Sequence, residues 1–495
     1  MKKNNSIYWY DLETFGIDSR RDRIAQFAGI RTDEALNVIS EPLIHYCQLS
    51  DEILPDPVSC LVTGITPSVV NEKGVGEAAF IDAIHQAFTV PNTCVAGYNS
   101  IRFDDEFIRN TLYRNFYDPY EREWKNGNSR WDIIDMARLA HALRPEGINW
   151  PKNDEGVTTF RLEKLTEANN ISHEMAHDAM SDVYATIALA KLIREKQPKL
   201  FDFVYQHRGK HAIAKYLNVR DAEPVVHISS KYPAGSHCMA VVLPLAVHPT
   251  NQNAHIVYDL SVDPTDLINL DVKSIQNRIF TATDQLKHGE ARIPLKAVHI
   301  NKCPVVVPLK TLDAASAKRV GVNLARCLEH RETIQDVNRK TDFSITEKVR
   351  QVFADLNYDK SDDPEFNLYA GFLNDNDKQK MQLIRSATES NINNISAIFD
   401  DKRLTELFVR YKARNFPGTL NDAEQLVWQD YRYSRLLEED NTSTLTLATF
   451  RARIQELKNN NAILVDKSSD DKIAILDALL NYSENIDLPE LMLET

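Results

Sequence analysis

The 495-residue chain has few cysteines, no long apolar run and fewer basic than acidic residues. Its six cysteines, at positions 47, 60, 94, 238, 303 and 327, include no Cys-x-x-Cys pair. This spacing argues against a zinc site or a disulfide framework and is typical of a reducing compartment, so we expect a cytoplasmic protein. No apolar stretch approaches the length of a membrane span. Acidic residues interrupt the segment that follows the basic start, which makes it a poor signal peptide.

Acidic residues outnumber basic ones by 71 to 58, which gives a formal net charge of −13. A negative average speaks against nucleic acid as a partner, but it does not exclude a local basic groove that contacts phosphates. The length predicts about three domains. With 43% hydrophobic and 26% charged residues, the composition is that of an ordinary globular protein.

Residues 7–16 contain the most informative pattern in the chain. Apart from Asp11, residues 7–12 are apolar, aromatic or β-branched, which predicts a buried strand near the centre of a sheet. Asp11 and Glu13 are two residues apart, so a strand would point both carboxylates to one face. Two buried like charges are costly unless a hard cation such as Mg²⁺ or Mn²⁺ neutralises them. Alternatively, the pair ends an ordinary edge strand, with Asp11 capping a turn.

The first two hundred residues are expected to form a mixed sheet with helices packed on it. Apolar alternation predicts further strands at residues 23–31, 37–47 and 93–97. Helical spacing of apolar residues predicts helices at residues 78–89, from 104 onward, and at 131–143, 160–169 and 178–195.

The pattern of apolar residues along the sequence changes twice beyond this region. Short β-type runs at residues 225–228, 239–245, 255–260 and 305–307 predict a small β-rich domain, for which a barrel is one option. Beyond residue 350 the pattern is strongly helical, and residues 361–364 are predicted to be a linker. We therefore expect domains at residues 1–198, 199–350 and 355–495.

Three acidic clusters lie within the first two hundred residues. After Asp11 and Glu13 come Asp104, at the start of a predicted helix, and then His177 with Asp182. Asp182 falls at the flank of the apolar stripe of its helix, so it need not be fully solvated. Four carboxylates and a histidine that converge would suit two-metal phosphodiester hydrolysis, in which the histidine takes the proton of water. A lone histidine at a helix start more often only hydrogen-bonds a neighbour.

The ordered combination is more specific than its parts. Asp-x-Glu, Asn-x-x-x-Phe-Asp and His-x-x-x-x-Asp at these intervals resemble the histidine-bearing branch of the DEDD exonuclease superfamily. Segments that resemble bacterial exonuclease I occur at residues 11–16, 113–120, 143–151, 299–304 and 413–420, over nearly the whole chain. The resemblance implies an α/β nuclease domain of ribonuclease H-like type, a β-rich SH3-like domain and an all-α C-terminal domain.

This family resemblance also implies an activity. The implied protein is a monomeric 3′→5′ exonuclease, specific for single-stranded DNA, that releases 5′-mononucleotides in DNA repair and recombination. Four carboxylates would hold two Mg²⁺ ions, for which Mn²⁺ is a substitute: Asp11, Glu13, Asp104 and Asp182. His177 would be the general base. Asp105 is a rival for Asp104, but the spacing of the motif selects Asp104.

Two other functions remain open. The same fold could act on RNA or on mismatched 3′ ends, although such relatives typically lack the two additional domains. The chain could also be a non-catalytic clamp on single strands, but a binding protein has no physical need to keep all five catalytic positions.

Single-stranded DNA is held by cations on phosphates and by aromatic rings under bases. By resemblance, the candidate contacts are Glu13, Arg109, Tyr120, Trp124, Arg138 and Arg161 in the nuclease domain, Lys210, Asn253, Lys296 and Asn301 in the β-rich domain, and Tyr369 in the helical domain. Taken singly, each arginine could lie on a solvated face, and Trp124 could be a core residue. Arg410, Lys412 and Arg414 form either a second basic patch or one polar helix face.

Members of the family bind the acidic C-terminal tail of single-stranded-DNA-binding protein in a basic pocket. Arg144 lies in a segment that matches the family and is our candidate for that pocket. Lys310, Lys318 and Arg319 could add charge to it or could lie on solvated surface.

Overall fold

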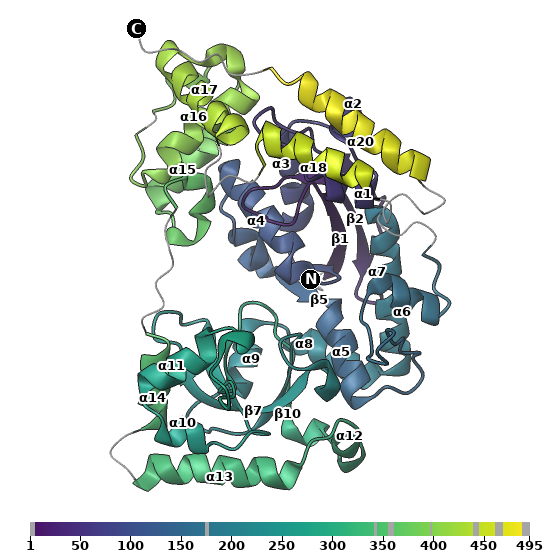
Figure 1. Ribbon diagram of the computed structural model, residues 1–495, viewed down its shortest axis with the longest axis vertical. Helices are drawn as coiled ribbons and strands as arrows, with labels where there is room; N and C mark the ends of the chain where they lie inside the picture. The colour runs from purple at the N-terminus through teal and green to yellow at the C-terminus, as the bar shows by residue number, and fades with distance from the viewer. Residues whose placement is uncertain are drawn as a thin grey trace.

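The computed structural model describes residues 5–173, 178–340, 344–354, 361–396, 398–438, 445–460 and 469–487. Figure 1 shows an α/β body, a β-rich body below it in teal, and a helical body in green and yellow that extends over the top of the α/β body. The predicted fold class is therefore confirmed. No described helix is both long and apolar enough to span a lipid bilayer.

The α/β body is built on a five-stranded mixed sheet with the order β3-β2-β1-β4-β5. Its strands are β1 (Ser6–Thr14), β2 (Ile24–Asp33), β3 (Leu43–Tyr46), β4 (Thr93–Gly97) and β5 (Ser129–Asp132). The central strand, β1, is antiparallel to β2 and parallel to β4. Every residue of β1 is buried except Asp11, which is half-buried. The pairing of β1 with β2 shifts register between Glu13 and Thr14, at the end where the acidic residues lie.

Alternation along β1 assigns its side chains to two separate cores. Tyr8 and Tyr10 pack with residues of α3 (Glu77–Thr89) and α4 (Asp104–Arg114) on one face. Trp9 packs on the other face, with residues of α5 (Ile133–Leu143) and α7 (Ala179–Lys196). Asp11 and Glu13 share the parity of Trp9, so the strand directs them toward the face that α7 covers.

Shorter helices complete this body, namely α1 (Pro57–Thr63), α2 (Pro67–Lys73), α6 (Leu162–Ala168) and α8 (Pro198–His207), whereas α9 (Lys210–Tyr216) packs with the β-rich body. Two predictions differ from the structure. The segment 37–47 forms a strand only at β3, and the predicted helix at 131–143 begins with the last two residues of β5. Asp132 ends that strand and also caps α5, because its carboxylate accepts a hydrogen bond from the backbone N–H of Ile134 at 3.0 Å.

The β-rich body has five antiparallel strands in the order β10-β6-β7-β8-β9. They are β6 (Val225–Ile228), β7 (Met239–Val247), β8 (Ala254–Asp259), β9 (Leu295–His299) and β10 (Val306–Pro308). Four of them were predicted, and β9 was not. The helices here are α10 (Thr265–Asn269), α11 (Val272–Phe280), α12 (Ala314–Arg319), α13 (Leu324–Lys340) and α14 (Ile345–Val352), and α14 packs against β7.

The helical body comprises α15 (Asp375–Arg385), α16 (Arg403–Asn415), α17 (Asp422–Leu437), α18 (Leu447–Asn459) and α20 (Ser469–Glu484). It shares two hydrophobic clusters with the α/β body. Phe15 and Leu49 pack in one cluster with Phe450 of α18 and Leu476 of α20, and Phe116 packs in the other with residues of α15 and α16. Figure 1 shows α18 and α20 lying across the α/β body.

Buried ion pairs reinforce the contact between these two bodies. The Glu365 carboxylate is 3.0 Å from Arg23 of the α/β body and 2.6 Å from Arg414 of α16. Arg414 also lies 2.8 Å from Glu52. Asp363, within the predicted linker, is 2.7 Å from Arg410. The end of that segment is thus fixed to the helical body, and Glu365 directly after it bridges to the α/β body.

Candidate active site

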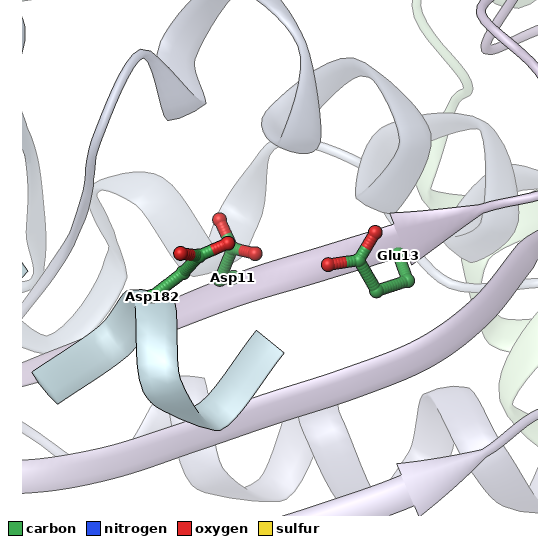
Figure 2. Close-up of side chains that lie close together, drawn as sticks. All are labelled: Asp11, Glu13 and Asp182. Carbon is green, nitrogen blue, oxygen red and sulfur yellow. The ribbon is translucent and has the colours of Figure 1, made fainter. Parts of the chain in front are cut away.

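Three carboxylates meet between the central strand and helix α7. Oxygens of Asp11, Glu13 and Asp182 lie within 4.8 Å of one another. Figure 2 shows Asp182 extending from the first turn of its helix toward Asp11, with Glu13 further along β1. The arrangement follows from the fold, because α7 packs against β1 and its N-cap, Asp178, accepts a hydrogen bond from the Ser181 N–H at 3.2 Å.

The fourth predicted carboxylate, Asp104, is buried at the start of α4. The loop before it is fixed by Asp132, whose carboxylate accepts hydrogen bonds from the N–H of Asn99 at 2.8 Å and of Ile101 at 3.2 Å. Asn99 has a φ of 60°, a left-handed conformation that asparagine tolerates. The charge of Asp104 helps to raise the pKa of Asp11, but Asp104 is not among the three residues whose oxygens meet within 4.8 Å.

Burial and mutual repulsion strongly disfavour negative charge on these carboxylates. Burial, reinforced by Asp11 and Asp182, raises the pKa of Glu13 to about 9. Burial, together with Asp104 and Asp182, raises the pKa of Asp11 well above its ordinary value. Burial also raises the pKa of Asp104. A cluster of carboxylate oxygens that cannot all ionise on their own is the donor set that a hard divalent cation binds.

Asp105 lies in the opposite environment. Its carboxylate is 2.7 Å from Arg122 and 2.5 Å from Arg130, and it accepts a hydrogen bond from the Tyr10 hydroxyl at 2.7 Å. Burial alone would raise the pKa of Asp105, but the two arginines lower it below its ordinary value. The charge of Asp105 is therefore already neutralised within the protein, which agrees with the choice of Asp104 from the motif.

The predicted general base, His177, lies outside the described residues. A different histidine, His173, contacts Asp182 through Nε2, and its Nδ1 is 3.0 Å from the hydroxyl of Thr166. Sequence reasoning missed His173. The only signal that could have found it is its place in the same short segment between α6 and α7, four positions before His177.

Several of the residues predicted to contact single-stranded DNA lie where α4 meets the helical body. The Arg109 guanidinium is buried, 2.7 Å from Glu123, and lies 5.6 Å from the ring centroid of Tyr120. The Tyr369 hydroxyl is 3.3 Å from Arg109, and the rings of Tyr120 and Tyr369 are 6.4 Å apart. Arg109 is thus engaged in an internal network, while the Tyr369 side chain is exposed.

Two more aromatic side chains of this region lie at the surface. Trp124, for which a core position was the alternative, is 64% exposed. Phe372 is 90% exposed, and its ring lies 5.9 Å from that of Tyr120. Sequence reasoning missed Phe372, although it follows the predicted Tyr369 by only three positions.

A second group of predicted contacts lies at the junction of the α/β and β-rich bodies. Arg138 is 2.6 Å from Asp135, which also pairs with Arg102 at 3.5 Å. The Lys296 ammonium lies 4.4 Å from the ring centroid of Tyr232, and its Nζ is buried with no hydrogen-bond partner among the described residues. Burial, followed by the charge of Arg102, lowers the pKa of Lys296 to about 7.

The remaining predicted contacts are more dispersed. Arg161 is the exposed N-cap residue of α6, and Lys210 is the exposed first residue of α9. Asn253 is half-buried, and its carbonyl accepts a hydrogen bond from the Ile300 N–H at 2.8 Å. Asn301 is exposed, and its carbonyl accepts one from Arg130 at 2.7 Å.

Both interpretations of the basic residues of α16 are wrong. Arg410 and Lys412 are buried, and Arg414 is largely so. Lys412 lies 2.7 Å from Glu424, and the two arginines bind acidic residues near the start of the helical body. These three residues therefore form neither an accessible basic patch nor a solvated helix face.

The residues predicted for a partner pocket lie where the end of α5 meets α12. Arg144 is 3.1 Å from Asp313 and donates a hydrogen bond to the carbonyl of Thr311 at 3.2 Å. Arg319 donates to the carbonyls of His141 and Ala142 at 3.0 and 2.7 Å, and Lys310 and Lys318 are exposed.

A mixed sheet with paired carboxylates on its central strand, and acidic residues near them from two helix starts, has the donor groups of a metal-dependent phosphodiester hydrolase. Residues 8–190 match the family model described as Exonuclease. Residues 208–355 match the Exonuclease I SH3-like domain, and residues 362–486 match the Exonuclease I C-terminal domain.

Whole-chain comparisons agree with these matches. Exodeoxyribonuclease I of Escherichia coli strain K12 is 44% identical over 488 residues, covering 98% of this chain and 99% of the relative. Exonuclease I from Methylocaldum szegediense is 48% identical, with a TM-score of 0.91 and coverage of 97% and 99%. The E. coli enzyme in complex with a dA16 oligonucleotide also has a TM-score of 0.91, at 44% identity and coverage of 98% and 100%. The chain belongs to the exonuclease I family and is a hydrolytic exonuclease.

Proposed function

We propose that this exonuclease degrades single-stranded DNA from its 3′ end, releases 5′-mononucleotides and acts in DNA repair and recombination. The observation that carries the proposal is the convergence of Asp11, Glu13 and Asp182 within 4.8 Å, with the charge of Asp104 acting on Asp11. The capture of an E. coli relative with the single-stranded oligonucleotide dA16 supports the choice of substrate.

The four carboxylates Asp11, Glu13, Asp104 and Asp182 would hold two divalent cations, with Mg²⁺ as the resident ion and Mn²⁺ as a substitute. Their all-oxygen donor set supports this choice of metal. A zinc-bound form of the E. coli enzyme with single-stranded DNA supports divalent-ion binding in the family. When bound, such a pair of ions supplies a nucleophile at neutral pH and stabilises the charge on the attacking and leaving oxygens.

The protein's own side chains have separate tasks. His177 accepts the proton of the attacking water at a ring nitrogen, because an imidazole titrates near neutrality without large tuning. His173 contacts Asp182 and thereby fixes the orientation of that carboxylate. Exposed Tyr369 and Trp124 offer ring faces to bases, while Arg161 and Lys210 offer charge to phosphates. Together these groups bind and position one unpaired strand.

We further propose that the acidic C-terminal tail of single-stranded-DNA-binding protein binds beside Arg144, with Lys310, Lys318 and Arg319 contributing charge. A solved structure described as SSB/Exonuclease I in complex with an inhibitor supports this class of partner. Replacing Arg144 by alanine should weaken binding of a labelled acidic tail peptide in fluorescence anisotropy. An unchanged affinity would place the peptide elsewhere.

We also propose a cytoplasmic monomer with domains at residues 1–198, 199–350 and 355–495. The six cysteines, all free, support a reducing compartment. The three matched segments support the division into domains. Light scattering after gel filtration would test the monomeric state.

The activity itself is tested with a 5′-labelled oligonucleotide, offered with Mg²⁺ as single-stranded DNA, as duplex or as RNA, beside an Asp11→Ala variant. We expect a ladder that shortens from the 3′ end on single-stranded DNA only, and no ladder with EDTA or with the variant. Equal or faster loss of RNA would favour an RNA substrate. Binding without shortening would leave only a strand clamp.

A further inference from the structure

Three arginines from two bodies of the protein surround a single phenylalanine ring. Arg20 and Arg21 lie in the loop between β1 and β2, which begins shortly after Glu13. Arg435 lies near the end of α17 in the helical body. Their guanidinium carbons are 6.0, 5.4 and 6.0 Å from the ring centroid of Phe366. We call these four residues the arginine cluster.

The positive charge of the arginine cluster is poorly matched by the protein. Only one carboxylate, Asp18, pairs with it among the described residues, at 3.3 Å from Arg20 and 3.7 Å from Arg21. The Nε of Arg21, which is the atom that faces Asp18, is buried and has no hydrogen-bond partner among the described residues. Within the described part of the chain, Arg435 makes contact with the Phe366 ring and forms no ion pair or hydrogen bond.

The neighbouring buried layer shows that this imbalance is local. Directly before Phe366, Glu365 pairs with Arg23 and Arg414, and Arg410 pairs with Asp363. In that layer every arginine has an acidic partner. In the arginine cluster, Asp18 is the only acidic partner among the described residues, and like charges around one ring repel one another unless an anion joins them.

The loop that carries two of the arginines is held rigidly. The Asp18 N–H donates to the Asp22 carboxylate at 2.8 Å, and the Asp22 N–H donates to the Asp18 carbonyl at 2.8 Å. Gly16 has no space for a Cβ, which would lie 2.0 Å from an Asp22 oxygen. The backbone positions of Arg20 and Arg21 are therefore fixed, which lowers part of the entropic cost of binding a ligand.

Planar guanidinium groups match the geometry of phosphate oxygens, and arginine is the preferred side chain for this task. We propose that the arginine cluster is a phosphate-binding site separate from the catalytic carboxylates, which takes a phosphate of the single-stranded DNA substrate or of the released 5′-mononucleotide. The proposal rests on the function proposed above. It places a second anchor for nucleotide phosphate at the contact between the nuclease sheet and the helical body.

The test uses the double variant Arg20→Gln/Arg435→Gln, because the Arg20 side chain is 51% exposed and Arg435 forms no ion pair or hydrogen bond with the described residues. Both changes are made in the full chain carrying Asp11→Ala, so that the strand is not cut. Binding of a long fluorescein-labelled oligothymidylate is measured over a series of salt concentrations. The slope of log affinity against log salt should become shallower by about 0.7 for each phosphate contact removed.

Two comparison variants sharpen the result. Arg20→Lys/Arg435→Lys keeps the charge and should keep most of the slope. Arg339→Gln/Arg350→Gln removes two exposed arginines of α13 and α14, at the opposite end of the molecule from α17, and should leave the slope unchanged.

A second arm distinguishes the two sources of phosphate. Inhibition of hydrolysis by free dTMP is measured in chains that keep Asp11. Weaker inhibition of the Gln double variant with an unchanged salt slope would assign the site to the mononucleotide. A salt slope and a dTMP inhibition that both equal those of the wild type would overturn the proposal. Absence of hydrolysis by the wild type would instead contradict the proposed function, while the binding arm would still decide the site.

Discussion

Asp104 and Asp105 are adjacent in the chain, yet their carboxylates lie in opposite electrostatic environments. Asp105 is held by Arg122 and Arg130 at 2.7 and 2.5 Å. Asp104 has a pKa that is raised by burial and by the charges of Asp105 and Asp132. One carboxylate is thus part of the folded framework, and the other carries repulsion that a metal would relieve.

This contrast predicts two different results for the same substitution. Asp105→Asn leaves the buried Arg122 without an acidic partner among the described residues and Arg130 with Glu123 alone, and should lower the free energy of unfolding by about 3–5 kcal/mol. Asp104→Asn removes a repulsive charge, so it should retain wild-type stability but lose exonuclease activity. Urea denaturation of the metal-free proteins and digestion of a labelled strand measure the two effects. A stable Asp105→Asn protein would show that its arginines find other partners.

The stability of the metal-free protein should depend on pH through Glu13. Its pKa in the folded protein, about 9, lies above the ordinary value of 4.5. The folded protein therefore holds a proton that the unfolded chain releases, and this contribution to stability is fully present below pH 4.5 and is lost as the pH rises toward 9. Glu13→Gln should flatten this dependence and raise the melting temperature at mildly alkaline pH in EDTA.

Adding Mg²⁺ provides the control for that measurement. It should stabilise the wild type at alkaline pH, because the ion neutralises the carboxylates, and should stabilise Glu13→Gln less. Equal pH profiles of the two proteins in EDTA would show that Glu13 ionises normally.

Replacing either of the two histidines before α7 should impair a different property of the enzyme. His177→Ala removes the proposed base and should lower the turnover rate by about 10²–10⁴-fold at any Mg²⁺ concentration. His173→Ala removes a contact to Asp182 and should weaken metal affinity by about 10–100-fold. Titrating activity with Mg²⁺ separates them, because high Mg²⁺ should rescue only the His173 variant. Rescue of both variants would argue that neither histidine acts as the base.

Lys296 should make strand binding sensitive to pH. Its pKa of about 7 means that the free protein loses this charge as the pH rises through neutrality. A bound phosphate favours the charged form, so binding takes up a proton and the affinity should fall with rising pH. Lys296→Arg keeps its charge and should remove this part of the pH dependence. Anisotropy titrations of both proteins across neutral pH provide the test.

The exposed ring of Phe372 should contribute to binding of long strands. Phe372→Ala should weaken binding by about 1–3 kcal/mol if one base stacks on the ring, whereas Phe372→Trp should retain the affinity. Leu383→Ala, at another exposed apolar residue of the helical body, is the matched control. Equal affinities of the Ala variant and the control would show that no base stacks there.

The sequence predicts those parts of the candidate site that depend on local pattern, and the structure brings Asp11, Glu13 and Asp182 together. The alternation of β1 assigns Asp11 and Glu13 to one face, and the apolar stripe of α7 places Asp182 at its edge. Family motifs distinguish Asp104 from Asp105. Each of these predictions depends on neighbours within one strand, helix or motif, whose periodicity is visible in the chain itself.

Features that depend on distant partners could not be predicted in this way. Arg410 and Arg414 look like a basic face of a helix, because their acidic partners Asp363 and Glu365 come from another segment. Strand β9 has a polar lysine and lies at the edge of its sheet, so its apolar signal is weak. Burial of Arg109 against Glu123 likewise depends on how the loop after α4 folds back.

The hydrophobic cluster that joins Phe15 to Leu476 and Leu479 makes the α/β body depend on the helical body. Phe15 directly follows β1, whereas the two leucines belong to the final described helix. The core beside the end of β1 is therefore completed only by residues that lie far along the chain, in the helical body. A chain that lacks α20 would expose this core to water, so residues 8–190 depend on the helical body to bury it, although they match a family model of their own.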